Sequence, residues 1–227
     1  KKVWVQGLLL QLFSLSIMIP FIIVFYIPYF SLIMESTNNQ SLGYNEFNKA
    51  LFEELGLYMI LAYLSIFVLS IASSILYLGF YRIVKEMDQG NPYAVSDFFY
   101  FFNSSRIGKS VGLLLAYFGI SVLAALLCFL PLIYAVIPLM FMFPVFAYNS
   151  HLTVSEIIKV AFALGNKKWG ISFLILILNV ILLYAVSFVT CGLGSLFVSC
   201  FLYLPQYIIY KKVIGFDMPE SESQTIV

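Results

Sequence analysis

Four long stretches of the sequence contain no charged residue, and they limit the folds that this chain can adopt. They run Val3–Met34, Leu55–Tyr81, Ser110–Ser155 and Trp169–Tyr210. Since about 20 apolar residues cross a bilayer, the first two stretches have room for one membrane-spanning helix each and the last two for two each. The sequence therefore predicts an all-α, polytopic membrane helix bundle with six transmembrane helices. The predicted spans are roughly 8–30, 57–81, 110–130, 132–149, 170–190 and 193–210.

Composition and periodicity both favour helices in a membrane. Of the 227 residues, 62% are hydrophobic and 10% are charged, which is more apolar surface than one soluble core of this size could bury. Unbroken apolar runs such as Gly170–Tyr184 lack the polar–apolar alternation of strands in a membrane β-barrel. We expect a single membrane domain over residues 1–215 and a flexible, acidic cytoplasmic tail over residues 216–227.

The basic residues predict how the chain is oriented. If the N-terminus is cytoplasmic, all of the twelve basic residues except Lys49 lie on the cytoplasmic side. Short cytoplasmic loops of membrane proteins carry an excess of Lys and Arg. We therefore expect both termini in the cytoplasm.

Two cytoplasmic segments are predicted to be helices that lie in the membrane interface. The first is Ser96–Ser105, with Ser96 as its N-cap and its aromatic side chains at the head-group boundary. A shallow aromatic re-entrant segment is the alternative for this stretch. The second is Ser155–Leu164, where Thr153 and Glu156 have the spacing of a capping box.

The same order of features occurs more than once and indicates an internal repeat. Aligning "SDFF" with "SEII" places Lys109 against Lys168, and two predicted spans follow in both copies. "KKVW" from Lys1 is similar to "KKWG" from Lys167, where a basic pair and a tryptophan lead into a span. The predicted unit is one interfacial helix plus two spans. The interfacial helix of the first unit would precede Lys1.

The sequence shows no pattern typical of a catalytic, cofactor or metal site. "GKS" at Gly108–Ser110 resembles the end of a phosphate-binding loop, but Asn103 stands where the first glycine is required. His151 is the only histidine, and the three cysteines lack zinc-site spacing. We therefore expect no enzyme activity and no cofactor. A disulfide between Cys128 and Cys191 stays open as the alternative to unpaired cysteines.

The predicted spans contain hydroxyl and amide side chains at helical spacing but no Asp, Glu, Lys or His. The absence of a titratable group disfavours a proton-coupled transporter. Polar groups in lipid pair across helices, so interhelical packing is the leading interpretation and a polar-lined cavity or ligand groove is the alternative. The candidate residues are Tyr63, Ser70, Ser74, Tyr77, Asn179, Ser195, Ser199, Tyr203 and Gln206.

Several cations stand beside the predicted span ends, where anionic head groups are the nearest partners. Membrane lipids are the expected partners, together with other membrane proteins or further copies of this chain. No nucleic-acid partner is expected. The candidate anionic-lipid contacts are Arg106, Lys109, Lys167 and Lys168.

One long section resembles a known family. Leu130–Leu178 has a proline-rich span, a cytoplasmic helix opened by Ser and Glu, and a basic pair with tryptophan before the next span; "SDFFYFF" precedes it and a proline-bearing span follows. Together these features resemble the YciC-like six-span membrane proteins and the membrane domain attached to some glycerophosphodiester phosphodiesterases. The resemblance begins at about Gly79. It implies a bacterial inner-membrane location and transfers no active site, since the phosphodiesterase chemistry belongs to a separate soluble domain.

The leading functional hypothesis is a non-catalytic integral inner-membrane protein that acts as a scaffold or lipid-interacting module. A passive channel or transporter for a small solute or lipid is the alternative, and an intramembrane enzyme comes third. A wet path between the polar faces of the second and sixth spans would favour transport. A dry bundle with lipid along its sides would favour the scaffold.

Overall fold

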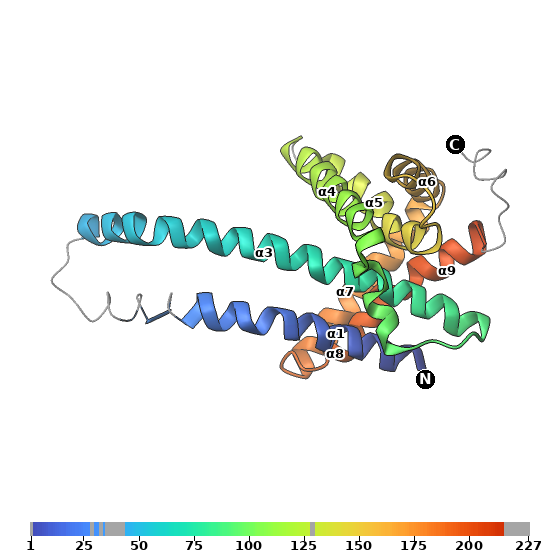
Figure 1. The fold of residues 1–227 in the computed structure, drawn as a ribbon, viewed down its shortest axis with the longest axis horizontal. Helices are drawn as coiled ribbons and strands as arrows, with labels where there is room; N and C mark the ends of the chain where they lie inside the picture. Colours follow the sequence, from blue (N-terminus) through green and yellow to red (C-terminus); the bar gives the residue numbers. More distant parts are fainter. Residues whose placement is uncertain (1, 28–29, 32–33, 35–43, 128–129, 216–227) are drawn as a thin grey trace. The chain divides into compact units, whose positions relative to one another are not determined.

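The computed structural model describes residues 2–27, 30–31, 34, 44–127 and 130–215 (Figure 1). Every regular element in this part of the chain is a helix. The predicted class, an all-α membrane helix bundle, is confirmed. The predicted tail lies outside the described residues.

The chain divides into two compact units. One unit is Leu12–Ser73, and the other combines Lys1–Gln11 with Ser74–Val227. Helices α1 (Lys2–Phe21) and α3 (Tyr44–Gln89) each contribute to both units. A single membrane domain for the whole stretch stays a prediction.

Five helical stretches within the described ranges are long and apolar enough to cross a membrane. They follow the first five predicted spans in order and differ mainly at their ends. The third begins before the predicted residue 110, because Arg106 and Lys109 are part of its first turns rather than of a loop. The stretches are Val3–Tyr26, Met59–Gln89, Ser104–Leu126 (α4), Pro131–Tyr148 and Trp169–Val189 (α7).

In the unit Leu12–Ser73, helix α1 continues into a π-helix, η1 (Ile22–Tyr26). Pro20 stands just before this change and lacks the N–H that an α-helix would use at that position. Irregular turns of this kind commonly accompany a proline within a helix. The rings of Phe21 and Phe25 pack together across the change, with centroids 4.8 Å apart.

The sixth predicted span is helical but is not one continuous helix. It consists of α8 (Ser195–Val198), a 3-10 helix η3 (Ser199–Leu202) and α9 (Leu204–Val213). Pro205 lies in the first turn of α9, where a missing N–H costs nothing because it would have no partner there. The proline therefore favours a new helix start. The single polar face expected along an unbroken helix from 193 to 210 is accordingly interrupted.

The core of the larger unit forms around α5 (Leu130–Tyr148). Helix α6 (Val154–Lys167) packs closely along α5. A Cβ atom on Gly165 would lie only 2.6 Å from the Cα of Pro138. Glycine at this position therefore permits the close approach of the two helices.

The helix predicted over Ser155–Leu164 and its capping box are both confirmed. The Thr153 hydroxyl accepts the Glu156 N–H at 3.3 Å, and the Glu156 carboxylate accepts the Thr153 N–H at 2.8 Å. The Thr153 hydroxyl also donates to this carboxylate at 2.7 Å. The two bonds that the carboxylate accepts, the backbone one first, hold the pKa of Glu156 below its usual value. The α6 side chains of Ile157, Ala161 and Leu164 are buried within the protein. A position at the membrane interface stays a prediction.

The first predicted interfacial helix differs from the prediction. It is a 3-10 helix, η2 (Val95–Phe102). The Asp97 carboxylate accepts the N–H of Ala94 at 2.8 Å, so Ala94 occupies the N-cap position and the assignment of Ser96 is wrong. The physical reason is local, since an acidic side chain three residues after the cap can bond back to its free N–H.

Two aromatic side chains of η2 point into the protein. Phe98 and Phe101 are fully buried, and their spacing of three residues puts them on one face of a 3-10 helix. A Cβ atom on Gly79 of α3 would lie 2.3 Å from the carbonyl oxygen of Phe98. The prediction that the aromatic side chains lie at the head groups is therefore wrong for these two, while Phe99 is exposed.

The predicted repeat stays a prediction. The element order is compatible with it, since η2 precedes α4 and α5, and α6 precedes α7 and the broken helical segment from α8 to α9. The two tryptophans that follow a basic pair and lead into a predicted span, Trp4 and Trp169, make similar contacts. The Trp4 indole N–H donates to the carbonyl of Phe197 at 3.1 Å, and that of Trp169 donates to the carbonyl of Tyr134 at 3.0 Å.

Candidate functional site

Tyrosines from α3 and from the last helical segment meet in the larger unit. The ring centroids of Tyr77 and Tyr203 are 4.7 Å apart. The Tyr81 hydroxyl donates to the backbone carbonyl of Tyr203 at 3.3 Å, and Tyr81 is buried. The structure thus brings together one candidate residue of the second predicted span, Tyr77, and one of the sixth, Tyr203, through ring packing, and Tyr81 adds a hydrogen bond to the same segment.

Tyr148, at the end of α5, extends this contact and was not among the predicted residues. Its hydroxyl donates to the carbonyl of Tyr81 at 3.1 Å, and its ring centroid lies 4.9 Å from that of Tyr210 and 6.0 Å from that of Tyr207. The Asn149 amide donates to the Tyr210 hydroxyl at 2.6 Å. We call the six side chains the tyrosine network: Tyr77, Tyr81, Tyr148, Tyr203, Tyr207 and Tyr210.

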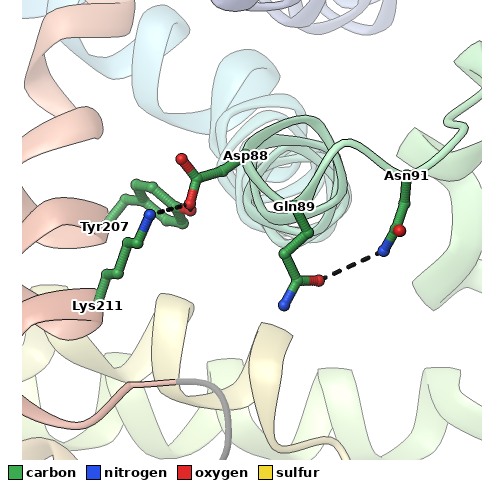
Figure 2. Close-up of polar contacts among 5 residues, drawn as sticks. All are labelled: Asp88, Gln89, Asn91, Tyr207 and Lys211. Atoms are coloured by element: carbon green, nitrogen blue, oxygen red, sulfur yellow. Dashed lines mark hydrogen bonds and ion pairs between the residues drawn. The ribbon is translucent and has the colours of Figure 1, made fainter.

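The tyrosine network reaches a charged pair near the C-terminal end of α3 (Figure 2). The Tyr207 hydroxyl donates to the Asp88 carboxylate at 2.7 Å, and the Lys211 ammonium group forms an ion pair with the same carboxylate. The Asn91 amide donates to the side-chain oxygen of Gln89 at 3.5 Å. The two contacts to Asp88 attach α9 to the end of α3. Sequence spacing places Tyr207 and Lys211 on one face of α9, but it carries no signal for Asp88, their distant partner.

The other residues of the predicted polar face are spread over both units. Tyr63 belongs to the smaller unit and is 65% exposed. The Ser70 hydroxyl donates to a carbonyl of its own helix at 2.8 Å. Ser74 and Asn179 are half-buried, on α3 and α7 respectively. The side chains that lie outside the described part are those of Ser195 and Ser199.

Gln206 lies at a small cavity between α5, α7 and α9. Its amide N–H approaches the sulfur of Met140 at 3.8 Å, while its carbonyl oxygen and the Ser172 hydroxyl are buried without a hydrogen-bond partner. The cavity measures about 10 Å³, which is room for about one water molecule. Ser172 was not predicted; a lone hydroxyl early in an apolar span is its only signal. The cavity is lined by Ile137, Met140, Phe141, Ser172, Pro205, Gln206 and Ile209.

The four predicted lipid-contact residues have different surroundings. The Lys109 ammonium group donates to the carbonyls of Ser150 at 2.8 Å and His151 at 3.3 Å, just beyond the end of α5. Lys109 therefore holds protein backbone in addition to any lipid it meets. The Arg106 guanidinium lies over the ring of Tyr100, 4.1 Å from its centroid. Of the other two, Lys167 is exposed and Lys168 is half-buried.

Comparison with known proteins supplies no relative from which a role could be transferred. No family model, no curated protein and no solved structure matches the chain.

The alternative of a disulfide between Cys128 and Cys191 falls partly outside the described residues. Cys128 is not described, and Cys191 is exposed.

Proposed function

We propose that this protein is a non-catalytic membrane scaffold whose helices interact with lipid. The observation that carries the proposal is the exposure of α7. In the most apolar stretch of 18 residues of this helix, only 6% of the residues are buried within the protein. The corresponding share in α5 is 56%. The exposed side chains of α7 are large and apolar and would be costly in water. They include Ile171, Leu174, Leu178, Ile181 and Phe188.

Apolar grooves in the smaller unit support the same proposal. One groove of about 420 Å³ is lined by side chains of α1, η1 and α3. Its lining has almost no polar group apart from Ser65, whose hydroxyl already donates to a carbonyl of its own helix at 2.7 Å. In a bilayer, lipid acyl chains would match such a groove in polarity. The lining residues are Ile17, Pro20, Phe21, Val24, Phe25, Leu64, Ser65, Val68 and Leu69.

A passive channel or transporter finds less support. The faces that could have lined a path meet as packed tyrosine rings, and the cavity at Gln206 has room for about one water molecule. Conduction would require the tyrosine network to separate. A bacterial inner membrane, cytoplasmic termini and membership of the family that the sequence resembles all remain part of the proposal. The basic residues near the end of α3 and at the start of α4 and α7 support a cytoplasmic position for these helix ends.

Spin labels test the proposal in lipid nanodiscs. The protein without native cysteines would carry a label at Leu178 on α7 or at the exposed Lys159 on α6. We expect the label at 178 to relax with oxygen, which concentrates in lipid, and the label at 159 to relax with a water-soluble nickel complex. A label at 178 that responds to nickel would contradict the proposal. Solute-loaded vesicles that leak only with the protein present would instead favour the channel.

A further inference from the structure

A second feature of the larger unit gathers positive charge at one tyrosine. Helix η2 is fixed against α3, because Gly79 allows its backbone to approach and Phe98 and Phe101 are fully buried. Tyr100 stands between those two anchors in the sequence and is only half-buried. Its position relative to α3 is therefore set by the packing on either side of it.

Two guanidinium groups converge on the ring of Tyr100. The Cζ atom of Arg82, three residues after Gly79 on α3, lies 3.7 Å from the ring centroid. The Cζ atom of Arg106, in the first turn of α4, lies 4.1 Å from it. An aromatic face attracts a cation, and such stacking also holds the planar guanidinium in a fixed orientation.

This arrangement leaves positive charge uncompensated. Within the described residues, neither Arg82 nor Arg106 forms an ion pair with a carboxylate. The nearby carboxylates have other donors: Glu86 accepts from the Asn91 amide at 2.8 Å and Asp97 from the Ala94 N–H at 2.8 Å.

Arg82 also has an unused donor. Its Nε atom is buried and has no hydrogen-bond partner. Two like charges that share one ring repel each other, and a ring face offers no acceptor to N–H groups in the guanidinium plane. An anion with several acceptor oxygens would offset this repulsion and accept hydrogen bonds from the guanidinium N–H groups.

We propose that Arg82, Tyr100 and Arg106 form a binding site for a phosphate group. The oxygens of a phosphate match the planar fork of a guanidinium, often through two parallel hydrogen bonds. The site lies near the end of α3, where Arg82, Lys85, Glu86 and Asp88 replace the apolar residues of the span. Lipid head groups occupy that level of a membrane, so a phospholipid is one source of the phosphate and a soluble phosphate compound is the other. The lipid source rests on the proposed function, whereas the soluble source does not.

Titration of the full chain in detergent and phosphate-free buffer tests the site. The probes are dioctanoyl phosphatidic acid, dioctanoylglycerol, which has the same chains without phosphate, and inorganic phosphate. The variants are Arg82→Gln, Arg106→Gln and the control Lys159→Gln, which removes one exposed positive charge elsewhere. We expect Arg106→Gln to weaken phosphatidic acid binding about tenfold or more and Lys159→Gln to leave it within about twofold. Binding of phosphatidic acid alone identifies a lipid, and binding of inorganic phosphate with the same dependence on Arg106 identifies a soluble source.

Two results would overturn the phosphate site. One is equal binding of dioctanoylglycerol and phosphatidic acid. The other is unchanged affinity in Arg106→Gln, including the case in which only its melting temperature falls, because that would assign the arginine a purely structural role. Should Arg82→Gln fail to fold, Arg106→Gln decides the matter, since Arg106 stands in the first turn of α4 beside exposed residues. The spin-label test of α7 is independent of both arginines, so failure of the scaffold proposal can be told apart from failure of this site.

Discussion

Helices α5 and α7 are both apolar enough to cross a membrane, yet they have opposite surroundings. Over half of the residues in the most apolar stretch of α5 are buried within the protein. In the same stretch of α7, almost none are. The difference does not follow from hydropathy, because lipid and protein interior are both apolar solvents. Close contacts distinguish them: α5 offers Pro138 to Gly165 of α6 and Tyr148 to the tyrosine network. Steric fit and aromatic pairing thus decide which span becomes the core.

The largest difference between the two helices should appear on truncation of a phenylalanine. Phe146 of α5 is fully buried with its ring centroid 5.2 Å from that of Phe101, whereas Phe188 of α7 is 89% exposed. We expect Phe146→Ala to lower the free energy of unfolding by about 3–5 kcal/mol and Phe188→Ala to change it by no more than about 0.5 kcal/mol. Unfolding by increasing SDS in mixed micelles measures both. Equal losses of unfolding free energy in the two variants would contradict the contrast between a buried α5 and an exposed α7.

A glycine pair tests the close approach of α6 to α5. A Cβ atom at Gly165 would meet Pro138, while one at Gly170, at the start of α7, would meet nothing within 4 Å. Gly165→Ala should therefore cost about 1–3 kcal/mol through overpacking, and Gly170→Ala should be neutral or slightly stabilising. Melting temperatures in detergent give the two values. Similar behaviour of the two variants would mean that α6 does not pack on α5 in this way.

The tyrosine network gives a smaller contrast. Tyr148→Phe removes the hydroxyl that donates to the Tyr81 carbonyl and keeps the ring. We expect a loss of about 0.5–1.5 kcal/mol, which is the usual net value of one hydrogen bond. Tyr184→Phe on the exposed surface of α7 is the matched control and should have little effect. Urea or SDS titration of both variants would sharpen the comparison, and a silent Tyr148→Phe would show that the hydroxyl is dispensable.

The smallest effect concerns the capping box of α6. The pKa of Glu156 is lowered chiefly by the hydrogen bond from the Thr153 N–H. A lowered pKa in the folded state gives stability that is present above the usual pKa of 4.5 and is lost as pH falls through the folded value. Amide exchange at the first turn of α6, corrected for intrinsic rates, should therefore rise in acid. Glu156→Gln, which cannot titrate, should remove this pH dependence; its persistence would point to another group.

Sequence was most informative where the cause is local. Charge-free runs were enough to locate five of the long helices, and the spacing of Thr153 and Glu156 was enough to locate the start of α6. The same spacing between Ala94 and Asp97 could have located the start of η2, but alanine has no capping side chain, so the sequence pattern favoured Ser96 as the N-cap.

Contacts between distant segments were not predictable from local pattern. The pairing of Arg82 with Tyr100 depends on η2 approaching α3 at Gly79, and nothing in the spacing of these residues encodes that approach. The prediction of one polar face along the last span assumed a continuous helix. Tyr203 still met Tyr77, but Pro205 begins a new helix and interrupts the face.

The central claim is that α7 faces lipid while α5 forms the core, and a lipid-soluble diazirine tests it on the unmodified protein. In nanodiscs the probe would be activated by light and the labelled residues identified by mass spectrometry. We expect strong labelling of α7 at Leu174, Leu178 and Ile181, and almost none of α5 at Phe141 and Val145. Equal labelling of the two helices, or an unlabelled α7, would contradict the account.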